Sequence, residues 1–515
     1  MKRNPLLFTA VALLLFACGK DETGGKEVIK MPPGASKYDN MPENLPTPLA
    51  QEVYSPSLKT TSYRPIMVDY ASGTAPVSKW NPVKTRVLSY VVGYTRTIEK
   101  QKDYQAMVNR YGSSTAKPKQ EVTGRFYVKK IDGRWWIVDP EGYLHYERSV
   151  TSMRKGSSAR NATAWNERFG SDEQWMATTQ TELAELGFHG TGAFCTNTYS
   201  VIQAHNAANT AAPMTLAPSF AFLGQFRSQI GAQYPGGNDL NECALVLIPN
   251  AAKTWEQFCV DYVATALAPY KEDRNLLGFF SDNELSFTSA TGGHLLQRLL
   301  DLNDASYACA YAQAFMAEKG AVAVTIALAS EFAGRIAEKY FKGVKDAVTA
   351  FDPGMMYLGS RLHGRPKQDE GVVRAAGKYC DIVAINYYGP WSPELDTYVK
   401  NWDEWANAPF LVTEFYTKGI EDSDLNNRSG AGLCVRNQAG RAYAYQHFTL
   451  GLLEAKNCVG WHWFKYQDDD GSDNSNAPAN KGVYDNYYKV FPTLGKFMRD
   501  LNYNVYSLVD WFDSK

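Results

Sequence analysis

The sequence has no excess of either charge. It contains 53 Lys and Arg against 54 Asp and Glu, which gives a formal net charge of −1. Proteins that bind nucleic acid usually carry a basic patch or stripe, and this balance gives no indication of one. We therefore expect no nucleic-acid partner and no strongly anionic substrate.

Cysteine patterns typical of metal sites are also missing. Apart from Cys18, the cysteines are scattered along the chain without a Cys-x-x-Cys pair or a Cys/His ligand spacing. No zinc site and no other cofactor is predicted from this pattern. Seven scattered cysteines in a large chain indicate mostly buried free thiols, and no disulfide can be deduced from their spacing. They are Cys195, Cys243, Cys259, Cys309, Cys380, Cys434 and Cys458.

The acidic stretch Asp468–Asn476 does not match a calcium loop. If Gly471 takes the sixth position of an EF-hand, Tyr466 falls at position one and Ala477 at position twelve. Neither side chain supplies a carboxylate ligand. We expect instead a solvated loop that touches sugar at the rim of the site.

One apolar run, Leu6–Ala17, stands at the N-terminus behind Lys2 and Arg3. It has the length of a signal-peptide core and is too short to span a bilayer. It ends in Leu-Phe-Ala-Cys-Gly at residues 15–19, which resembles a bacterial lipobox and implies lipidation of Cys18. The alternative is an ordinary secretory signal with a chance cysteine.

The residues after Cys18 suggest where such an anchor would lie. Lys20-Asp21-Glu22 resembles the export signal of surface lipoproteins in Bacteroidetes-type bacteria. We expect residues 1–18 to be a lipoprotein signal and the lipid to hold the protein on a membrane. The location would be the outer membrane, cell surface or periplasm of a Gram-negative bacterium.

The chain then divides into three further parts. Residues 19–62 are rich in Pro, Gly, Ser, Thr, Lys and Glu and are predicted to be a flexible tether. Residues 63–120 are predicted to decorate the main domain, with a strand at Val87–Val92. Residues 121–515 are predicted to form the catalytic domain.

Two tight turns open this last domain. Asp132-Gly133 lies between the strand-like runs Arg125–Val128 and Arg134–Val138, and residues 139–142 turn into Tyr143–Tyr146. An Asp-Gly pair between such runs is a strong signal for a hairpin. We expect this meander to close the floor of the domain.

Strand-like and helical patterns then alternate. A capping-box pattern at Ser171 and Gln174 starts one helix, and apolar residues at helical spacing mark others at 255–270 and 336–351. Eight apolar runs with helical connections predict an α/β fold of the (β/α)8, or TIM-barrel, type with a short N-terminal extension and a β-hairpin floor. These runs are Tyr143–Tyr146, Phe188–Phe194, Thr215–Phe226, Leu277–Glu284, Met356–Ser360, Asp381–Tyr388, Pro409–Phe415 and Cys458–Phe464.

Glu284 and Glu414 end the fourth and seventh of these runs. In a parallel barrel the carboxyl ends of the strands meet at one rim, so both carboxylates should face one site. Two carboxylates across a sugar ring are the minimum set for glycoside hydrolysis. A structural ion-pair role for both is the alternative. The aromatic content, with 32 Tyr, 24 Phe and 12 Trp, favours carbohydrate as the ligand, although large cores also use many aromatic residues.

Other residues at the same strand ends are candidates for binding sugar. Asn283 is suited to a hydrogen bond with the sugar 2-hydroxyl, and Tyr387 or Tyr388 could donate to the nucleophile and keep it ionised. Capping and packing roles are the alternatives for these three.

On the eighth run, side-chain alternation predicts that Trp461 and Trp463 point to one side and His462 to the other. At least one of these three should face substrate as a stacking platform. Arg361 and His363, after the fifth run, are candidates for contacts with sugar hydroxyls or for solvated loop positions.

Several stretches together resemble the β-agarases of glycoside hydrolase family 50, over most of the chain from about residue 111 to 488. They are Asn109–Gly112, Gly133–Gly142, Leu277–Glu284, Gly460–Asp468 and Asn480–Gly482. The resemblance implies a retaining barrel glycosidase in which Glu284 is the general acid/base and Glu414 the nucleophile. It also implies cleavage of β-1,4 links between D-galactose and 3,6-anhydro-L-galactose.

Members of that family carry a sandwich-like module ahead of the barrel, and this chain has room only for a remnant. Exo and endo action therefore both stay open. The alternatives are another retaining barrel enzyme acting on porphyran, mannan or β-galactosides, and a non-catalytic glycan-binding surface lipoprotein.

Overall fold

A computed structural model describes residues 36–54, 61–195, 197–230, 242–249, 253–288, 293–302, 306–470 and 478–515. The predicted signal peptide and Cys18 lie outside the described residues. In the described part, no helix combines the length and apolar character needed to cross a membrane.

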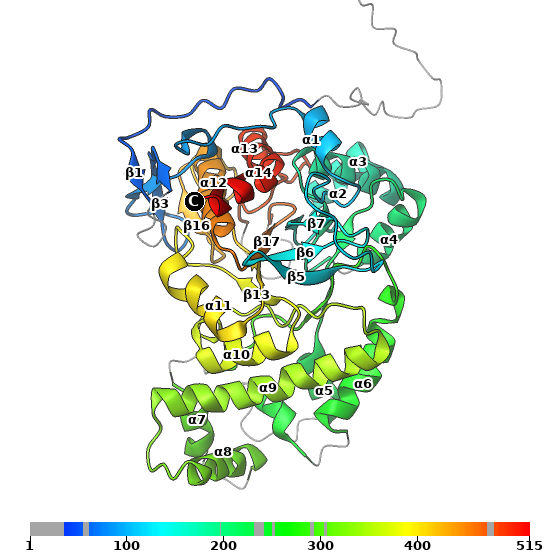
Figure 1. Cartoon of the computed structure of the whole chain (residues 1–515), viewed down its shortest axis with the longest axis vertical. Helices are drawn as coiled ribbons and strands as arrows, with labels where there is room; N and C mark the ends of the chain where they lie inside the picture. Colours follow the sequence, from blue (N-terminus) through cyan, green and yellow to red (C-terminus); the bar gives the residue numbers. More distant parts are fainter. Residues whose placement is uncertain are drawn as a thin grey trace, which may run out of the picture.

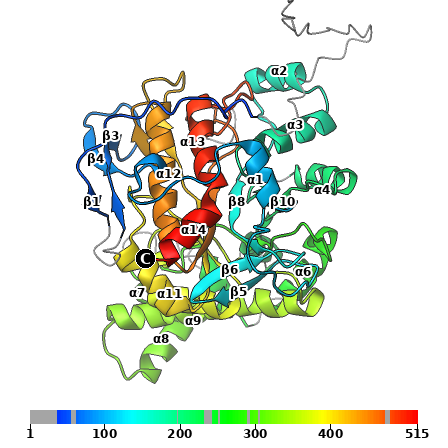
Figure 2. The ribbon, with the colours of Figure 1, turned by 45° about the horizontal axis from the view of Figure 1, so that its top comes forward.

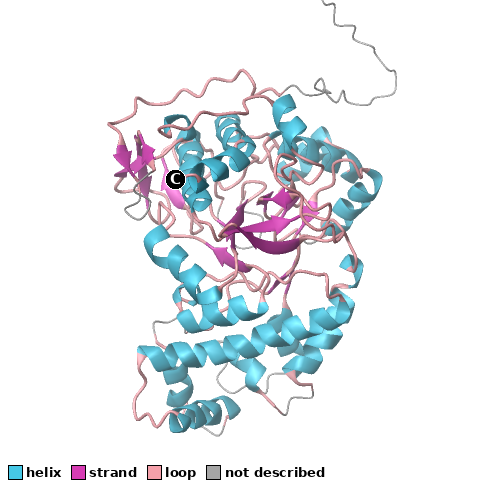
Figure 3. Cartoon of the chain, viewed as in Figure 1, coloured by secondary structure: helices cyan, strands magenta, loops and turns pink. Residues whose placement is uncertain are grey.

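Strands gather at the centre of the molecule and helices surround them (Figure 3). Six strands pair in parallel in the order β10-β9-β8-β17-β14-β13, and β11 pairs in parallel with β12. Apart from β11, every residue of these strands is buried, as expected for strands covered on both faces. They are β8 (Glu147–Val150), β9 (Gly190–Thr191), β10 (Thr215–Leu216), β11 (Ser219–Phe220), β12 (Phe280–Ser281), β13 (Val383–Asn386), β14 (Phe410–Glu414) and β17 (Cys458–Trp463).

The structure confirms the α/β class, but its regular strands do not form one continuous eight-stranded sheet. The predicted run Met356–Ser360 is not a regular strand, and single parallel bridges connect Phe279 with Tyr357 and Leu362 with Ile385. The run Thr215–Phe226 is strand only in its first half, because a helix begins at Phe222. The Tyr143 run belongs to the hairpin floor, and β8 follows it as the first parallel strand.

Helices pack around the strands in sequence order (Figures 1 and 2). The longest, α9, buries an apolar face that includes Phe332, Ile336, Tyr340 and Val344. The α-helices are α1 (Gln101–Met107), α2 (Ala159–Arg168), α3 (Asp172–Glu185), α4 (Tyr199–Ala208), α5 (Phe222–Ile230), α6 (Trp255–Ala266), α7 (Leu295–Asp301), α8 (Tyr307–Glu318), α9 (Ile326–Phe351), α10 (Glu370–Tyr379), α11 (Lys400–Ala406), α12 (Gln438–Glu454), α13 (Pro492–Tyr503) and α14 (Val505–Asp513). Shorter turns are η1 (Leu88–Tyr90), η3 (Glu242–Leu247), η4 (Ala268–Tyr270), η5 (Pro366–Gln368) and the π-helical η6 (Leu395–Val399).

The predicted floor is present as three antiparallel strands, β5 (Tyr127–Ile131), β6 (Arg134–Val138) and β7 (Leu144–His145). Asp132 and Gly133 both have positive φ, as a tight hairpin turn requires. Phe126 and Ile137 join a small apolar cluster with inward-facing residues of the central strands. The hairpin therefore closes the apolar end of that cluster.

The N-terminal segment pairs with a part of the chain far away in sequence. β3 (Ile66–Ala71) and β4 (Asn81–Thr85) join β15 (Thr417–Gly419) and β16 (Leu433–Val435) in a four-stranded sheet of order β15-β16-β3-β4. β15 begins three residues after Glu414. The N-terminal hairpin thus supports the chain that leaves the end of β14.

Two expectations for the N-terminus need correction. Residues 36–54, placed in the predicted tether, lie against the body: Tyr38 is buried and the Ser36 hydroxyl donates to Glu185 at 2.6 Å. Part of this segment, β1 (Glu52–Val53), pairs with β2 (Ser62–Tyr63). The predicted strand at residues 87–92 contains the helical turn η1 instead.

The prediction of free thiols is confirmed for the described part of the chain. All seven cysteines from Cys195 to Cys458 are unpaired and buried.

Candidate active site

Glu284 and Glu414 both lie at the carboxyl ends of central strands. Glu414 is the last residue of β14 and is 5% exposed, whereas Glu284 lies three residues beyond β12 and is half-buried. Glu284 adopts a positive φ of 54°. Non-glycine residues hold this conformation where the surrounding structure demands it, as functional sites often do. The two carboxylates therefore differ in exposure, which suits different chemical roles.

Arg361 connects the two strand ends. Its Nη2 donates to Glu414 Oε1 at 2.5 Å and to the Thr413 carbonyl at 3.2 Å, and its Nη1 donates to Asn283 Oδ1 at 2.9 Å. The side chain is fully buried, with the guanidinium 4.6 Å from the centre of the Phe194 ring. Sequence reasoning placed Arg361 among sugar-hydroxyl contacts or loop residues. Its position makes it the charge partner of Glu414.

Asn386 provides a second connection that sequence reasoning missed. Its Nδ2 donates to Glu284 Oε1 at 2.7 Å and to Asn283 Oδ1 at 3.3 Å, and its Oδ1 accepts from the Thr413 hydroxyl at 2.7 Å. Asn386 ends β13 and Thr413 is the next-to-last residue of β14. Polar residues at the ends of buried strands were the available signal.

The structure separates the roles of the two tyrosines after β13. Tyr388 Oη donates to Glu414 Oε2 at 2.6 Å. Tyr387 Oη instead donates to Glu394 Oε2 at 3.1 Å, and its ring packs edge-on against Trp402. Of the two, Tyr388 is the one placed to act on Glu414.

Opposing influences act on the Glu414 carboxyl. Burial is the largest and raises its pKa, and the negative charge of Glu284 raises it further. The Arg361 charge and the hydrogen bonds from Tyr388 and Arg361 lower it. The net effect is a raised pKa, because burial disfavours a charge more than these contacts favour it. Burial also raises the pKa of Tyr388 well above its usual value, so this hydroxyl keeps the proton that it donates.

Asn283 and His363 are placed where substrate could reach them. Asn283 is exposed, and its Oδ1 accepts from Arg361 and Asn386, so its Nδ2 is the group that could donate to a substrate oxygen. His363 is half-buried, with Nδ1 3.3 Å from the Asn386 carbonyl and its ring edge-on to Tyr388.

The expected stacking platform on the eighth run is not present. Trp461, His462 and Trp463 are all fully buried. The predicted alternation holds: both tryptophans pack against Tyr445 of α12, while His462 faces inward toward Phe280 and Gly192. Burial on both faces of β17 explains the difference, since a strand end covered by α12 cannot offer these rings to sugar.

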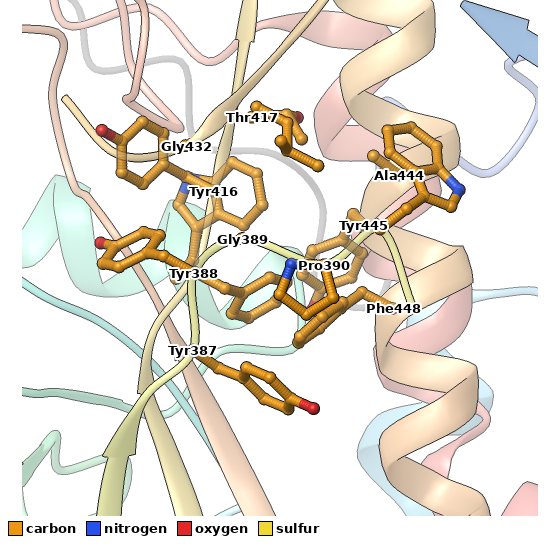
Figure 4. A pocket seen from close by; sticks show the side chains of 14 residues that line it. Tyr387, Tyr388, Gly389, Pro390, Tyr416, Thr417, Gly432, Ala444, Tyr445 and Phe448 are labelled. Carbon is orange, nitrogen blue, oxygen red and sulfur yellow. The ribbon is translucent and has the colours of Figure 1, made fainter. Parts of the chain in front are cut away.

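A small pocket lies next to Tyr388, between the chain after β13 and α12 (Figure 4). Its walls are largely aromatic, and no residue lining it is charged. The lining residues are Tyr387, Tyr388, Gly389, Pro390, Trp391, Phe415, Tyr416, Thr417, Gly432, Leu433, Ala444, Tyr445, Phe448 and Trp463. Trp463 thus lines this pocket together with Tyr388 and Tyr416.

The first two residues of the predicted solvated loop are buried. Asp468 accepts from Asn480 Nδ2 at 2.9 Å and from the Gly482 amide at 2.6 Å, and burial raises its pKa to about 7. Asp469 forms ion pairs with Lys465 and, at 2.7 Å, with Lys481. Residues 471–477 lie outside the described residues. Asp468 and Asp469 therefore hold the Gly460–Asp468 and Asn480–Gly482 stretches together.

Known proteins resemble this chain both in sequence and in structure. No protein-family model matches the chain. Two curated Vibrio enzymes, β-agarase B and β-agarase A, are 28% and 27% identical over 152 and 142 residues. These alignments cover 27% and 26% of this chain but only 14% of each curated enzyme.

Solved structures match over much greater lengths. The crystal structure of BpGH50 is 44% identical, with a TM-score of 0.84, and the match covers 91% of this chain and all of that one. The agarase AgWH50C is 20% identical with a TM-score of 0.62, covering 78% of this chain and 66% of its own. An exo-β-agarase is 19% identical with a TM-score of 0.60, covering 78% and 67%. These last two show the shared fold.

The match to BpGH50 extends over 91% of this chain at 44% identity, which is enough to show a shared family. The chain belongs to glycoside hydrolase family 50, the β-agarase family that its motifs resemble.

Proposed function

We propose that this protein is a retaining glycoside hydrolase that cleaves β-1,4 linkages of agarose or agaro-oligosaccharides. The observation that carries the proposal is the hydrogen-bonded set that joins Glu284, Asn386, Arg361 and Glu414. The curated relatives and two of the solved structures are agarases, which supports a galactan substrate.

In this mechanism Glu414 is the nucleophile. Its ionised carboxylate attacks the anomeric carbon, and the bond to the leaving sugar breaks to give a covalent glycosyl-enzyme. Arg361 and Tyr388 support the ionised form, because both donate hydrogen bonds to its oxygens. Burial opposes ionisation, so the nucleophile depends on these two donors.

Glu284 is the general acid and then the general base. Its proton passes to the glycosidic oxygen as the leaving sugar departs, and it later removes a proton from the water that hydrolyses the glycosyl-enzyme. Asn386 fixes the orientation of its carboxyl group, and the half-exposed position gives it access to both the leaving sugar and water.

We also propose that the fold is a (β/α)8 barrel. The six-stranded sheet ends at β10 and β13. Parallel bridges between Leu216 and Leu276, Phe279 and Tyr357, and Leu362 and Ile385 continue the pairing from β10 through β12 to β13. This circuit supports closure, although three of its connections are single bridges.

The N-terminal sequence features also support a proposal for where the enzyme is located. A lipid on Cys18, after a signal at residues 1–18, would hold the enzyme on a membrane of a Gram-negative bacterium, within reach of polysaccharide. Incorporation of labelled palmitate, abolished in Cys18→Ala, is the expected result. A labelled Cys18→Ala variant would contradict the anchor.

The catalytic proposal is tested by product analysis. Agarose, porphyran and mannan are offered to the enzyme, and we expect neoagarobiose-type products from agarose. Proton NMR of the first product should show the β-anomer, because double displacement retains configuration. An initial α-anomer would rule out retention, and an absence of products from agaro-oligosaccharides would rule out the substrate.

Glu284→Gln and Glu414→Gln should each lower kcat by at least about 10³-fold, whereas a glycan-binding protein would keep its function in both variants.

A further inference from the structure

Phe194 is a half-buried aromatic residue that sequence reasoning did not place among the site residues. It comes three residues after β9 ends, and its neighbours Ala193 and Cys195 are fully buried. β9 lies in the parallel sheet that also contains β14, so its carboxyl end points the same way as the end that carries Glu414. Phe194 is therefore at the rim of the candidate site, with part of its side chain exposed.

The ring of Phe194 points toward the residues that hold the nucleophile. Gly192, two residues earlier, faces inward, because a Cβ there would lie 2.4 Å from His462 Nδ1. Side chains two residues apart on a strand point the same way, and the Phe194 ring centre lies 4.6 Å from the Arg361 guanidinium. Phe280 of β12 lies 5.5 Å from the same group and is fully buried. Of these two rings on Arg361, Phe194 is the one with exposed surface.

The backbone of Phe194 adopts a positive φ of 65°. A bulky non-glycine residue rarely holds this conformation, and such residues gather at functional sites. Positive φ values recur near the same rim, at Ser152, Asp282, Glu284 and Arg361. Glu284 and Arg361 belong to the hydrogen-bonded set of the candidate site. The unusual backbone of Phe194 thus places a phenyl ring beside this set.

A sugar that reacts with Glu414 must lie close to Phe194. Arg361 Nη2 donates to Glu414 Oε1 at 2.5 Å, and Phe194 contacts the same guanidinium. The anomeric carbon has to approach the carboxylate that Arg361 holds. One part of the Phe194 side chain packs on Arg361 and on the small apolar cluster that includes Phe280. The exposed part is therefore available to the bound sugar.

We propose that Phe194 is a substrate-binding residue, whose exposed ring packs against the apolar face of the galactose bound at Glu414. This inference rests on the proposed function, because it takes Glu414 as the nucleophile and a galactan as the substrate. Galactose has an axial hydroxyl, which leaves C–H bonds gathered on one face of the sugar. These slightly positive hydrogens complement the negative face of a phenyl ring. The contact orients the galactose and leaves its hydroxyl groups free for polar partners.

Calorimetry tests this contact without turnover. Glu284→Gln should bind an agaro-oligosaccharide without cleaving it, and adding Phe194→Ala should weaken this binding by about 10-fold, which corresponds to about 1.4 kcal/mol. Adding Phe194→Tyr retains the ring face and should change the affinity by less than about three-fold. Phe351→Ala is the matched control, since Phe351 is also half-buried and its ring lies 5.1 Å from the Lys271 ammonium, but it is at the end of α9. This control should leave the affinity unchanged.

Steady-state kinetics separates substrate binding from a purely supporting role. In the enzyme with an intact Glu284, Phe194→Ala should raise KM for the oligosaccharide by about 10-fold, and Phe194→Tyr should recover most of the loss. A ring that only supports Arg361 would instead lower kcat and leave the dissociation constant unchanged, because Arg361 acts through Glu414. That result would overturn the inference.

Two further outcomes also count against Phe194. Weakening by Phe194→Tyr as large as that by Phe194→Ala would show that the ring face does not bind the sugar. If Phe194→Ala does not fold, Phe194→Gly takes its place, because glycine suits a φ of 65° and also removes the ring. Unchanged affinity in that variant would be equally decisive.

The same measurements separate this failure from failure of the proposed function. Equal binding by Glu284→Gln with and without Phe194→Ala overturns the Phe194 inference alone. No binding by Glu284→Gln, together with no cleavage by wild type, overturns the agarase proposal.

Discussion

Arg361 lies 2.5 Å from Glu414 and shares one guanidinium between this carboxylate and Asn283. Its φ of 54° is unusual for an arginine, and its side chain is fully buried. The backbone conformation and the ion pair together fix the end of β14 relative to the chain after β12. Arg361 is therefore a positioning residue that acts through Glu414.

Replacing Arg361 should impair Glu414, the proposed nucleophile. Arg361→Met is expected to lower kcat/KM by about 10²- to 10³-fold, the effect of removing a preorganised donor. The pKa of Glu414 should rise further, because the Arg361 charge lowers it. Since the proposed role of Glu414 requires its ionised form, the acidic limb of the kcat/KM profile should move to higher pH. Arg335→Met, which breaks an exposed ion pair on α9, is the control, and an unmoved acidic limb would contradict the assignment.

Tyr388 and Tyr387 form a matched pair for a second test. Tyr388→Phe removes the hydrogen bond to Glu414, which raises the carboxyl pKa and should shift the acidic limb of kcat/KM upward. A fall in kcat of about 10-fold is expected. Tyr387→Phe removes only the contact with Glu394, so the acidic limb should stay in place. Equal shifts in both variants would show that the hydroxyl of Tyr388 has no special effect.

Asn386 should matter for orientation of Glu284. Asn386→Ala removes the 2.7 Å hydrogen bond to Glu284 and is expected to lower kcat on oligosaccharides by about 10- to 100-fold. An aryl galactoside with a good leaving group needs little acid assistance and should be affected less. Thr413→Val, which frees the far side of Asn386, should show the same pattern more weakly. Equal losses on both substrates would argue against a role in proton transfer.

The strand pattern was enough to predict where in the fold two of the candidate site residues lie. Glu284 and Glu414 stand at the ends of apolar runs, so their placement followed from topology. The choice between Tyr387 and Tyr388, and the parts played by Arg361 and Asn386, depend on side-chain directions across different strands. No local pattern encodes these directions. Trp461 and Trp463 were misjudged because the sequence does not reveal that α12 covers their face of β17.

About as much of the fold as of the candidate site could be predicted from the sequence. The hairpin floor and most helices carry local signals, such as Asp132-Gly133 and the cap at Ser171, whose hydroxyl accepts from the Gln174 amide. The pairing of β3 with β16 carries no local signal, since the two strands come from opposite ends of the chain. The pairings near residues 276 and 357 are single bridges, so the regular sheet is incomplete there. The apolar runs in the sequence do not reveal this.

Lys418 provides a test of the link between the N-terminal hairpin and the site. This fully buried lysine donates to the carbonyls of Gly73 at 2.9 Å, Ser429 at 3.1 Å and Gly430 at 3.0 Å. Lys418→Met should lower the free energy of unfolding by roughly 1–3 kcal/mol, because these carbonyls lose a charged donor. We also expect a lower kcat, since Gly430 packs directly on Tyr416 and Tyr416 packs edge-on against Tyr388.

Chemical denaturation and steady-state kinetics measure these two effects. Lys342→Met, at an exposed ion pair on α9, should change neither. A destabilised Lys418→Met with wild-type kcat would show that the link supports stability alone.

The four-stranded sheet also has a consequence for the order in which the enzyme is completed. Gly73 and Lys418 are 345 residues apart, so the N-terminal hairpin is synthesised long before its partner strands exist. Contacts of such high sequence separation form late, because a long loop must close first. The chain beyond β14 receives its support only when this closure occurs. Newly made enzyme should thus gain activity in a final step, when its N-terminal strands dock beside the chain that follows Glu414.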